Sequence, residues 1–170
     1  MDPISPVMRP ARLDDAERIA DYHHACRLLA FSALFDETIV QQMQPKLERW
    51  RSWLADGSDF TTVVAVDGDD VPFGHVTVRG NVLAHLFIDP PRHRQGFGRT
   101  LLAVGEQLIC DAGHAEAELQ TRVGNDPAIA LYASAGWVMT DEVRTDEDDP
   151  GVTVSEHVLR KTLAPQAGAV

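Results

Sequence analysis

VLAHLFIDPPRHRQGFGRTLL, residues 82–102, carries the clearest structural pattern in this chain. Its apolar first third ends at Ile88, and a proline-rich, basic run then leads to Gly96 and Gly98. From Phe97 onward, apolar residues recur every three or four positions as far as Leu108, which is the spacing of one helix face. The pattern predicts a strand, a tight loop and then a helix.

The predicted loop is also suited to hold an anion. Glycine lets a ligand approach the backbone without meeting a Cβ atom, and the first turn of a helix offers unpaired N–H groups at its positive end. Basic side chains lie in the same turn, at Arg92, His93, Arg94 and Arg99. Because the whole chain has a formal net charge of −11, this local basic cluster indicates a phosphate-bearing ligand.

Two common nucleotide-binding motifs do not match this loop. A dinucleotide fingerprint needs a third glycine where this chain has Leu101, and the Lys-Ser/Thr pair that ends an NTPase phosphate loop is absent. A plainer interpretation stays open, because many strand-to-helix turns use glycine only to turn the chain.

A family resemblance fits where those motifs fail. FIDPPRHRQGFGRTLL, residues 87–102, resembles the acetyl-CoA motif of the GNAT superfamily of N-acetyltransferases, with His93 where the family usually has Arg or Gln. A second segment, NDPAIALYASAGW at residues 125–137, resembles the family's Asn-x-x-Ala-x-x-Leu-Tyr-x-x-x-Gly-Phe segment, with Trp137 in place of Phe. The resemblance covers about residues 63–137.

This resemblance implies an α/β protein with the GNAT fold. The expected sheet is mixed and mostly antiparallel, has about six to seven strands, is splayed between the fourth and fifth strands, and is flanked by about four helices. The 170 residues suit a single domain, residues 1–170, with flexible ends at 1–6 and 162–170.

The resemblance also implies acetyl-CoA as cosubstrate and assigns residues to it. The backbone of the central strand would pair with the pantetheine arm, the loop and helix start would hold the pyrophosphate, and an asparagine would hydrogen-bond the pantetheine. The strand residues that match are Leu86, Phe87 and Ile88. The residues that match the pyrophosphate loop and helix start are His93, Arg94, Gln95, Gly96, Phe97, Gly98 and Arg99, and the asparagine is Asn125.

Tyr132 stands where relatives carry the general acid that protonates the thiolate of CoA, although its apolar neighbours also fit a core aromatic. Some relatives use a glutamate base at the position of Gln120, and an amide cannot accept the proton. Glu118, two residues earlier on the same face, is one substitute. His85 on the central strand is another candidate base, ahead of His75, although a lone strand histidine is more often structural.

The resemblance therefore implies an enzyme that moves acetyl from acetyl-CoA to a primary amine of a small molecule, or to a protein N-terminus, by direct attack in a ternary complex. The alternative is a non-catalytic acyl-CoA-binding regulatory module, which Gln120 and His93 keep open. No metal is expected, because neighbouring residues such as His23 and His24 point apart on a helix.

Composition places further bounds on function. With 44% hydrophobic residues and no run of about 18 apolar residues, the chain reads as a soluble protein without a membrane span, and its first residues lack a secretory signal pattern. Two cysteines in helix-like stretches suggest free thiols in the reducing cytoplasm. The acidic balance disfavours binding to nucleic acid and favours a cationic acceptor, and a homodimer is compatible with it.

The remaining segments give a coarse element map. We expect a first strand near residues 7–11, a helix capped by Asp14 that runs to about residue 30, helical structure over 36–54 with a break at Pro45, and a hairpin over 60–78. A strand over 115–121 should lead to a helix capped by Asp126. Two last strands, 137–144 and 152–159, should flank a solvated acidic loop at 146–151.

Overall fold

Seven strands form one mixed sheet in the computed structural model, which describes residues 6–164. They are β1 (Val7–Pro10), β2 (Thr61–Val66), β3 (Pro72–Arg79), β4 (Val82–Ile88), β5 (Glu116–Arg122), β6 (Val138–Asp149) and β7 (Val152–Thr162). Their order across the sheet is β1-β2-β3-β4-β5-β7-β6, and only β4 and β5 pair in parallel. The mixed, mostly antiparallel fold expected from the sequence is confirmed.

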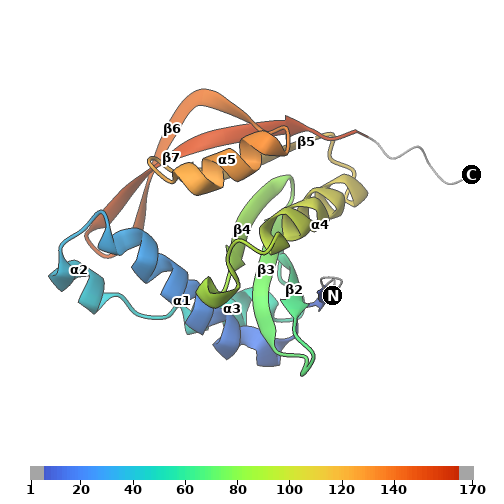
Figure 1. Ribbon diagram of the computed structural model, residues 1–170. Coiled ribbons are helices and arrows are strands. Elements are labelled where there is room, and N and C mark those ends of the chain that lie inside the picture. The colour runs from blue at the N-terminus through green and yellow to red at the C-terminus, as the bar shows by residue number, and fades with distance from the viewer. Residues whose placement is uncertain (1–5, 165–170) are drawn as a thin grey trace, which may run out of the picture.

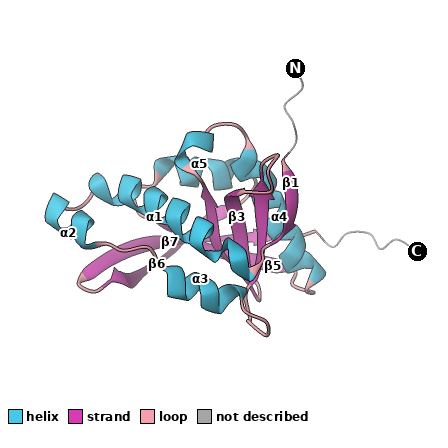
Figure 2. Cartoon of the chain, turned by 90° about the horizontal axis from the view of Figure 1, so that it is seen from below, coloured by secondary structure: helices cyan, strands magenta, loops and turns pink. Residues whose placement is uncertain are grey.

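Helices cover both faces of this sheet (Figure 2). They are α1 (Ala16–Ser32), α2 (Glu37–Gln42), α3 (Leu47–Leu54), α4 (Phe97–Asp111) and α5 (Asp126–Ser134), with short 3-10 helices η1 (Leu13–Asp15) and η2 (Pro90–Arg92). The break between α2 and α3 contains Pro45, as expected, because proline removes a helix donor and clashes with the preceding turn.

Strand β2 shows why two helical layers are needed. Side chains alternate along a strand, so Val64 and Val66 pack on one face with Trp50 of α3, while Val63 and Ala65 join the core that contains α4 on the other. Because both faces of the strand are apolar, each must be covered. We call these the α1/α3 face and the α4 face of the sheet.

The parallel pair β4 and β5 is joined only at its start. Val82 pairs with Glu118 and Leu83 with Leu119, and no later pair is formed between these strands within the described residues. The halves of the sheet then diverge, with β2–β4 on one side and β5–β7 on the other (Figure 1). The predicted splay between the fourth and fifth strands is confirmed.

A bulge in β4 sets the direction of the side chains beside this splay. Leu83 pairs with Val78 and His85 pairs with Thr77, so Ala84 is the extra residue. Leu83 and Val78 lie in the core of the α4 face, whereas His85 contacts the Trp50 ring on the α1/α3 face. On a regular strand Leu83 and His85 would share a face, because side chains two apart point the same way, and the bulge instead sends them to opposite faces.

Both helix caps expected from the sequence are wrong. Asp14 lies inside η1, and Asp15, the residue before α1, does not cap that helix with its side chain; its carboxylate accepts a hydrogen bond from the Arg12 backbone N–H, at 2.7 Å. Asn125 rather than Asp126 caps α5, with its side-chain oxygen 3.4 Å from the N–H of Ala128. Capping motifs in a run of Asp and Asn residues allow such a shift, since each residue type is a good cap.

The acidic segment near residue 149 is also not a loop. Strand β6 continues to Asp149, and only a tight turn at Pro150 and Gly151 separates it from β7. The Asp149 carboxylate is paired with Arg27 of α1 and with Lys46, whose ammonium is 2.7 Å away. These two cations hold an acidic strand end that the sequence alone would leave to solvent.

The end of β7 stays in contact with the sheet as far as residue 163. Thr162 closes β7, and buried Leu163 donates its N–H to the carbonyl of Ala115 at 2.8 Å, while the flexibility expected of residues 162–164 stays a prediction. Residues 1–5 and 165–170, which were also expected to be flexible, lie outside the described residues.

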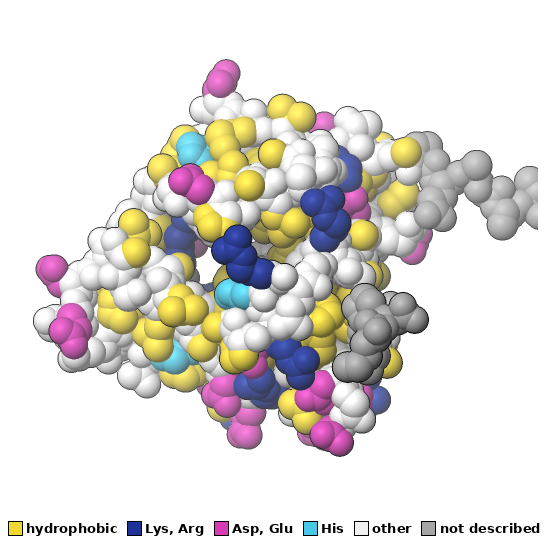
Figure 3. Space-filling model, viewed as in Figure 1, with side chains coloured by type: hydrophobic (Ala, Val, Ile, Leu, Met, Phe, Trp, Pro, Cys, Tyr) yellow, Lys and Arg dark blue, Asp and Glu magenta, His cyan; other side chains and the backbone are white. Residues whose placement is uncertain are grey.

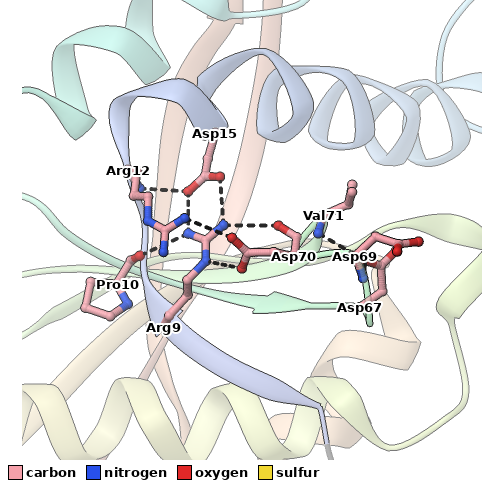
Figure 4. A network of polar contacts seen from close by, with 8 residues as sticks. All are labelled: Arg9, Pro10, Arg12, Asp15, Asp67, Asp69, Asp70 and Val71. Carbon is pink, nitrogen blue, oxygen red and sulfur yellow. Dashed lines mark hydrogen bonds and ion pairs between the residues drawn. The ribbon is translucent and has the colours of Figure 1, made fainter.

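The turn between β2 and β3 is tied to the start of the chain (Figure 4). The Asp67 carboxylate accepts hydrogen bonds from the N–H groups of Asp69 and Val71, as a turn-forming aspartate does. Asp70 then pairs with Arg9 at 2.7 Å, and Arg9 also pairs with Asp15 at 2.8 Å. This network fixes the edge strand β1 and the entry to α1.

No helix within residues 6–164 is long and apolar enough to cross a membrane.

Candidate active site

A cleft with a volume of about 360 Å³ lies where β4 and β5 separate. Its lining comes from both sides of the splay and from helices α1, α3 and α5. The lining residues are His23, Cys26, Arg27, Ala30, Arg49, Val82, Leu83, Ala84, His85, Leu86, Phe87, Gln120, Thr121, Arg122, Asn125, Ala128, Tyr132, Asp146 and Glu156.

Five of the residues expected to bind acetyl-CoA or to act in catalysis share this cleft: His85, Leu86, Phe87, Asn125 and Tyr132. They are contributed by β4 and by the cap and body of α5, which are far apart along the chain. The parallel start of β4 and β5 is what brings these elements together at the splay. Ile88 and residues 93–99 follow at the end of β4 and do not line it.

Tyr132 is buried within α5, with 7% of its surface exposed. Burial raises the pKa of its phenol to about 12. The phenol therefore keeps its proton at neutral pH and reaches the cleft as a hydrogen-bond donor.

The loop before α4 has the backbone shape of an anion cradle. Arg94 and Gly96 have positive φ angles of 62° and 86°, which turns successive N–H groups toward one side. The N–H groups of Phe97, Gly98 and Arg99 follow in the first helical turn, at the positive end of α4. A Cβ atom at Gly98 would lie 3.5 Å from a methyl of Leu131, which is an ordinary contact distance. Packing therefore does not require glycine at this position.

Exposed basic side chains surround this cradle. Arg94 and Arg99 are exposed, and Arg99 donates to the hydroxyl of Ser134 at 2.8 Å, which links α4 to α5. Basic side chains gather on the same face of the molecule (Figure 3). In an acidic protein, such a group favours binding of a phosphate.

The carbonyl of Ile88 is held by two side chains. His93 places its Nε2 atom 2.7 Å from this oxygen, and the Cys26 thiol donates to it at 3.0 Å. His93 thus braces the loop against β4, which is a structural role for a position where the family usually has Arg or Gln. Burial raises the pKa of the Cys26 thiol to about 12, so it stays protonated and is a poor nucleophile.

His85 lies in a box of aromatic rings on the α1/α3 face. Its ring centroid is 4.9 Å from that of Trp53, 5.1 Å from His23 and 5.4 Å from Phe87. These rings cover one side of the imidazole, and the other side of the imidazole faces the cleft. This is a suitable setting for a group that exchanges a proton with a bound amine.

Two further histidines in this box are held neutral. Burial lowers the pKa of His75 well below its usual value, and the charge of a protonated His85 would lower it further. Burial, His85 and His75 likewise lower the pKa of His23. His75 shares a hydrogen bond of 2.8 Å with the Tyr22 hydroxyl, and fully buried side chains surround it, so it does not reach the cleft.

Glu118 is not available as the base. Its carboxylate pairs with Arg144 at 2.6 Å and with Arg160 at 3.1 Å. Burial alone would raise the pKa of Glu118, but the hydrogen bonds from these arginines outweigh it and lower the pKa. Gln120 does reach the cleft, although its amide cannot take a proton.

Sequence reasoning missed the side chains that α1 and α3 add to the cleft, chiefly His23, Cys26, Arg27 and Arg49. In the sequence, His23 was noticed only as an unlikely metal ligand, and Cys26 only as one of two free cysteines. Their spacing of three residues on a helix does indicate a shared face, but nothing in the sequence shows that this face meets β4. Within the described residues, no cluster of three or more His, Cys, Asp or Glu is arranged to hold a metal.

Comparison with known proteins agrees with this geometry. The family model for the acetyltransferase (GNAT) domain matches residues 18–152, which is most of the chain. This protein therefore belongs to the GNAT acetyltransferase family.

Curated relatives match over shorter segments. A mycothiol acetyltransferase of Clavibacter sepedonicus is 42% identical over 52 residues, which is 31% of this chain and 17% of that protein. A mycothiol acetyltransferase of Catenulispora acidiphila is 37% identical over 68 residues, which is 40% of this chain and 19% of that protein. The matches thus span less than a fifth of each relative's length.

Solved structures share the fold over nearly the whole chain. PaiA N-acetyltransferase from Thermoplasma acidophilum, in complex with coenzyme A, has a TM-score of 0.76 at 16% identity and covers 94% of this chain and 99% of that one. A GCN5-related N-acetyltransferase of Rhodopseudomonas palustris has a TM-score of 0.73 at 22% identity, with 96% and 99% covered. A phosphinothricin acetyltransferase from Sinorhizobium meliloti, in complex with AcCoA, has a TM-score of 0.69 at 14% identity, with 98% and 96% covered.

Proposed function

We propose that this protein moves an acetyl group from acetyl-CoA to a primary amine, either on a small molecule or at a protein N-terminus, by direct attack in a ternary complex. One observation carries the proposal. Tyr132, Asn125 and His85 line a single cleft at the splay of a GNAT-family sheet.

The proposed cofactor path starts at the loop before α4. The pyrophosphate binds the N–H groups of residues 94–99, aided by the exposed Arg94 and Arg99. Pantetheine then runs along Leu86, Phe87 and Ile88, where β4 has no β5 partner, and Asn125 hydrogen-bonds it from across the splay. The Ile88 carbonyl is already engaged by Cys26 and His93, so the Ile88 N–H is the group left to hydrogen-bond pantetheine.

The reaction forms a C–N bond and breaks the thioester C–S bond. An alkyl amine is protonated at neutral pH, with a pKa of about 10 for a lysine-like amine, so it must lose one proton before attack and another after it. In the proposal, His85 accepts a proton through its face on the cleft. Holding both substrates in line at the splay supplies much of the rate.

Tyr132 acts at the departing sulfur. A phenol with a pKa of about 12 holds its proton more tightly than a thiol with a pKa of about 8.5. Tyr132 therefore donates a hydrogen bond to the sulfur while negative charge develops there. The phenol gives its proton to the thiolate only as it receives another proton, which comes ultimately from the amine.

The second candidate, a non-catalytic acyl-CoA-binding module, is favoured by one specific observation. Glu118 is engaged by two arginines and Gln120 cannot act as a base, so neither of the two β5 positions considered for the base supplies one. This candidate predicts tight acyl-CoA binding without turnover.

Purified protein, acetyl-CoA and a panel of primary amines separate the two candidates. We expect amine-dependent release of free CoA thiol, with one N-acetylated product formed for each thiol, detected by mass spectrometry. Binding of acetyl-CoA with no amine-dependent thiol release across the panel would reject the enzyme and favour the binding module.

A further inference from the structure

Arg49 is a basic side chain of the cleft that has no ion pair with an acidic residue within residues 6–164. Arg27, which also lines the cleft, is paired with Asp149, and the Arg122 guanidinium lies 3.7 Å from the centroid of the Phe31 ring. For Arg49 there is no carboxylate within 4.0 Å anywhere in residues 6–164. In a chain with a net charge of −11, a cation that points into a cleft without an ion pair is a feature to explain.

Aromatic rings hold this guanidinium in place. Arg49 lies on α3 with its guanidinium 5.6 Å from the centroid of the Trp53 ring. Trp53 is in turn stacked on Phe60, with centroids 4.2 Å apart and an angle of 17° between the rings. A guanidinium stacked on an aromatic face keeps its N–H edge available, and it loses little freedom when it then binds a planar anion.

The same tryptophan also contacts the proposed base. The ring centroids of Trp53 and His85 are 4.9 Å apart, so one ring touches both Arg49 and His85. An acceptor whose amine lies at His85 would therefore have the rest of its body next to Arg49. Both groups belong to the α1/α3 face, whereas the proposed pyrophosphate site is at the start of α4 on the other face.

We propose that the acceptor is a small amine that also carries a carboxylate, of the amino-acid type, and that Arg49 binds this carboxylate. The inference rests on the proposed function, since it assigns the acceptor of that same site. A bidentate Arg–carboxylate pair would give the half-buried guanidinium the partner that the protein itself does not provide. The acidic surface still favours approach of the ammonium end, so a zwitterion satisfies both.

The test compares acids with their amides. Acetylation is measured for a panel of natural amino acids and for the same amino acids as primary amides, with wild-type protein and Arg49→Met. Methionine keeps an unbranched apolar side chain over Trp53 and removes the charge. The matched control is Arg51→Met, since Arg51 lies on the same helix but is 48% exposed and pairs with Glu48 at 2.7 Å.

We expect Arg49→Met to lower kcat/KM for the acids by about 10- to 100-fold, the usual loss when a hydrogen bond to a charged group is removed, and to leave the amides within about twofold. The acid and amide of one amino acid differ in amine pKa, but this difference cancels because each substrate is compared between two proteins. Arg51→Met should change neither series, and the Kd of CoA should be the same for all three proteins.

Two results would overturn the inference. An equal loss for acids and amides would mean that Arg49 supports the cleft without reading a carboxylate, and a weakened CoA affinity would mean that it binds a cofactor phosphate. If no amine is acetylated, the proposed function fails, and tryptophan fluorescence of the CoA-saturated protein decides the inference separately. Amino acids should then change the signal in wild-type protein but not in Arg49→Met, and the absence of such a change would reject the site.

Discussion

Tyr132 is the residue on which the proposed chemistry depends most. Tyr132→Phe keeps the ring that fills the core beside Trp137 and removes only the hydroxyl. If the phenol serves the departing sulfur, kcat should fall by about 10²- to 10⁴-fold, the usual scale for general acid catalysis, with acetyl-CoA affinity and Tm nearly unchanged. Steady-state kinetics and thermal unfolding check this.

A core role alone would leave kcat within about twofold, and the thiolate would then take its proton from water or from the substrate ammonium. The pH profile gives a further check. Burial raises the pKa of Tyr132 to about 12, so an alkaline loss of kcat below pH 11 should be the same in Tyr132→Phe and in wild type.

Gly98 tests the anion cradle at the scale of one Cβ atom. Gly98→Ala places a methyl only 3.5 Å from Leu131, which is ordinary contact, and alanine favours the helix, so the fold should be as stable or more so. The Kd of CoA should rise at least about tenfold, since the methyl lies where the phosphate must approach the first helical turn. Isothermal titration measures the affinity.

Gly105 on the same helix is the control for that variant. A Cβ at Gly105 would lie 2.7 Å from a methyl of Val76 and 3.0 Å from one of Leu83, so Gly105→Ala should lower Tm. An unchanged Kd in Gly98→Ala would contradict the placement of the pyrophosphate.

Among the elements, the β6–β7 hairpin depends on a charge cluster with α1. Asp149→Asn removes the carboxylate charge that pairs with Arg27, a side chain that is 2% exposed. Breaking a buried pair by removing one partner typically costs about 3 to 5 kcal/mol, so urea unfolding should show a loss of this order. Asp141→Asn, an exposed position on the same strand, should cost little.

The pH dependence of this cluster has a definite sign. Burial would raise the pKa of Asp149, but the hydrogen bond from Lys46 and the charge of Arg27 lower it. Its contribution is therefore present above the unfolded pKa of about 3.9 and is lost as the pH falls through the lower folded value. The stability difference between wild type and Asp149→Asn should shrink in that acid range, and a difference that grows there would contradict the pairing.

The elements that the sequence predicted well are those with a strong local pattern. Residues 82–88 form β4 as expected, because an apolar run bounded by Gly80 and Pro90 leaves few alternatives. The splay followed from the family resemblance, which is specific in that region. The length of β6 could not be predicted, since acidic residues favour a loop unless distant cations such as Arg27 and Lys46 pair with them.

The side of the cleft formed by α1 and α3 was the part least accessible to sequence reasoning. His23 and Arg49 lie on two helices with no shared motif, and they meet at β4 only because α1 and α3 pack on the same face of the sheet. The bulge at Ala84, which turns His85 toward them, leaves no mark in the apolar pattern of the strand. Tertiary packing decides such a site.

At the scale of the whole molecule, the buried histidines make stability sensitive to acid. The folded state lowers the pKa of His23 and His75, chiefly through burial, so the unfolded chain binds more protons below about pH 6.5. Unfolding free energy should therefore fall with decreasing pH, by up to about 1.4 kcal/mol per pH unit for each histidine. Urea titrations between pH 7 and pH 5 measure this slope.

One variant identifies the source of the slope. His75→Phe should make the slope shallower, whatever its effect on stability at pH 7. A wild-type stability that does not change from pH 7 to pH 5 would show that the two histidines take up protons in the folded state.

The central claim is that the splay between β4 and β5 is where acetyl-CoA meets its acceptor. A crystal structure of the protein with CoA tests it most directly. We expect the pyrophosphate within hydrogen-bond distance of the N–H groups of residues 96–99, and the sulfur in the cleft within hydrogen-bond distance of the Tyr132 hydroxyl. Ordered CoA whose pyrophosphate lies away from the start of α4, or whose sulfur points out of the cleft, would contradict the account.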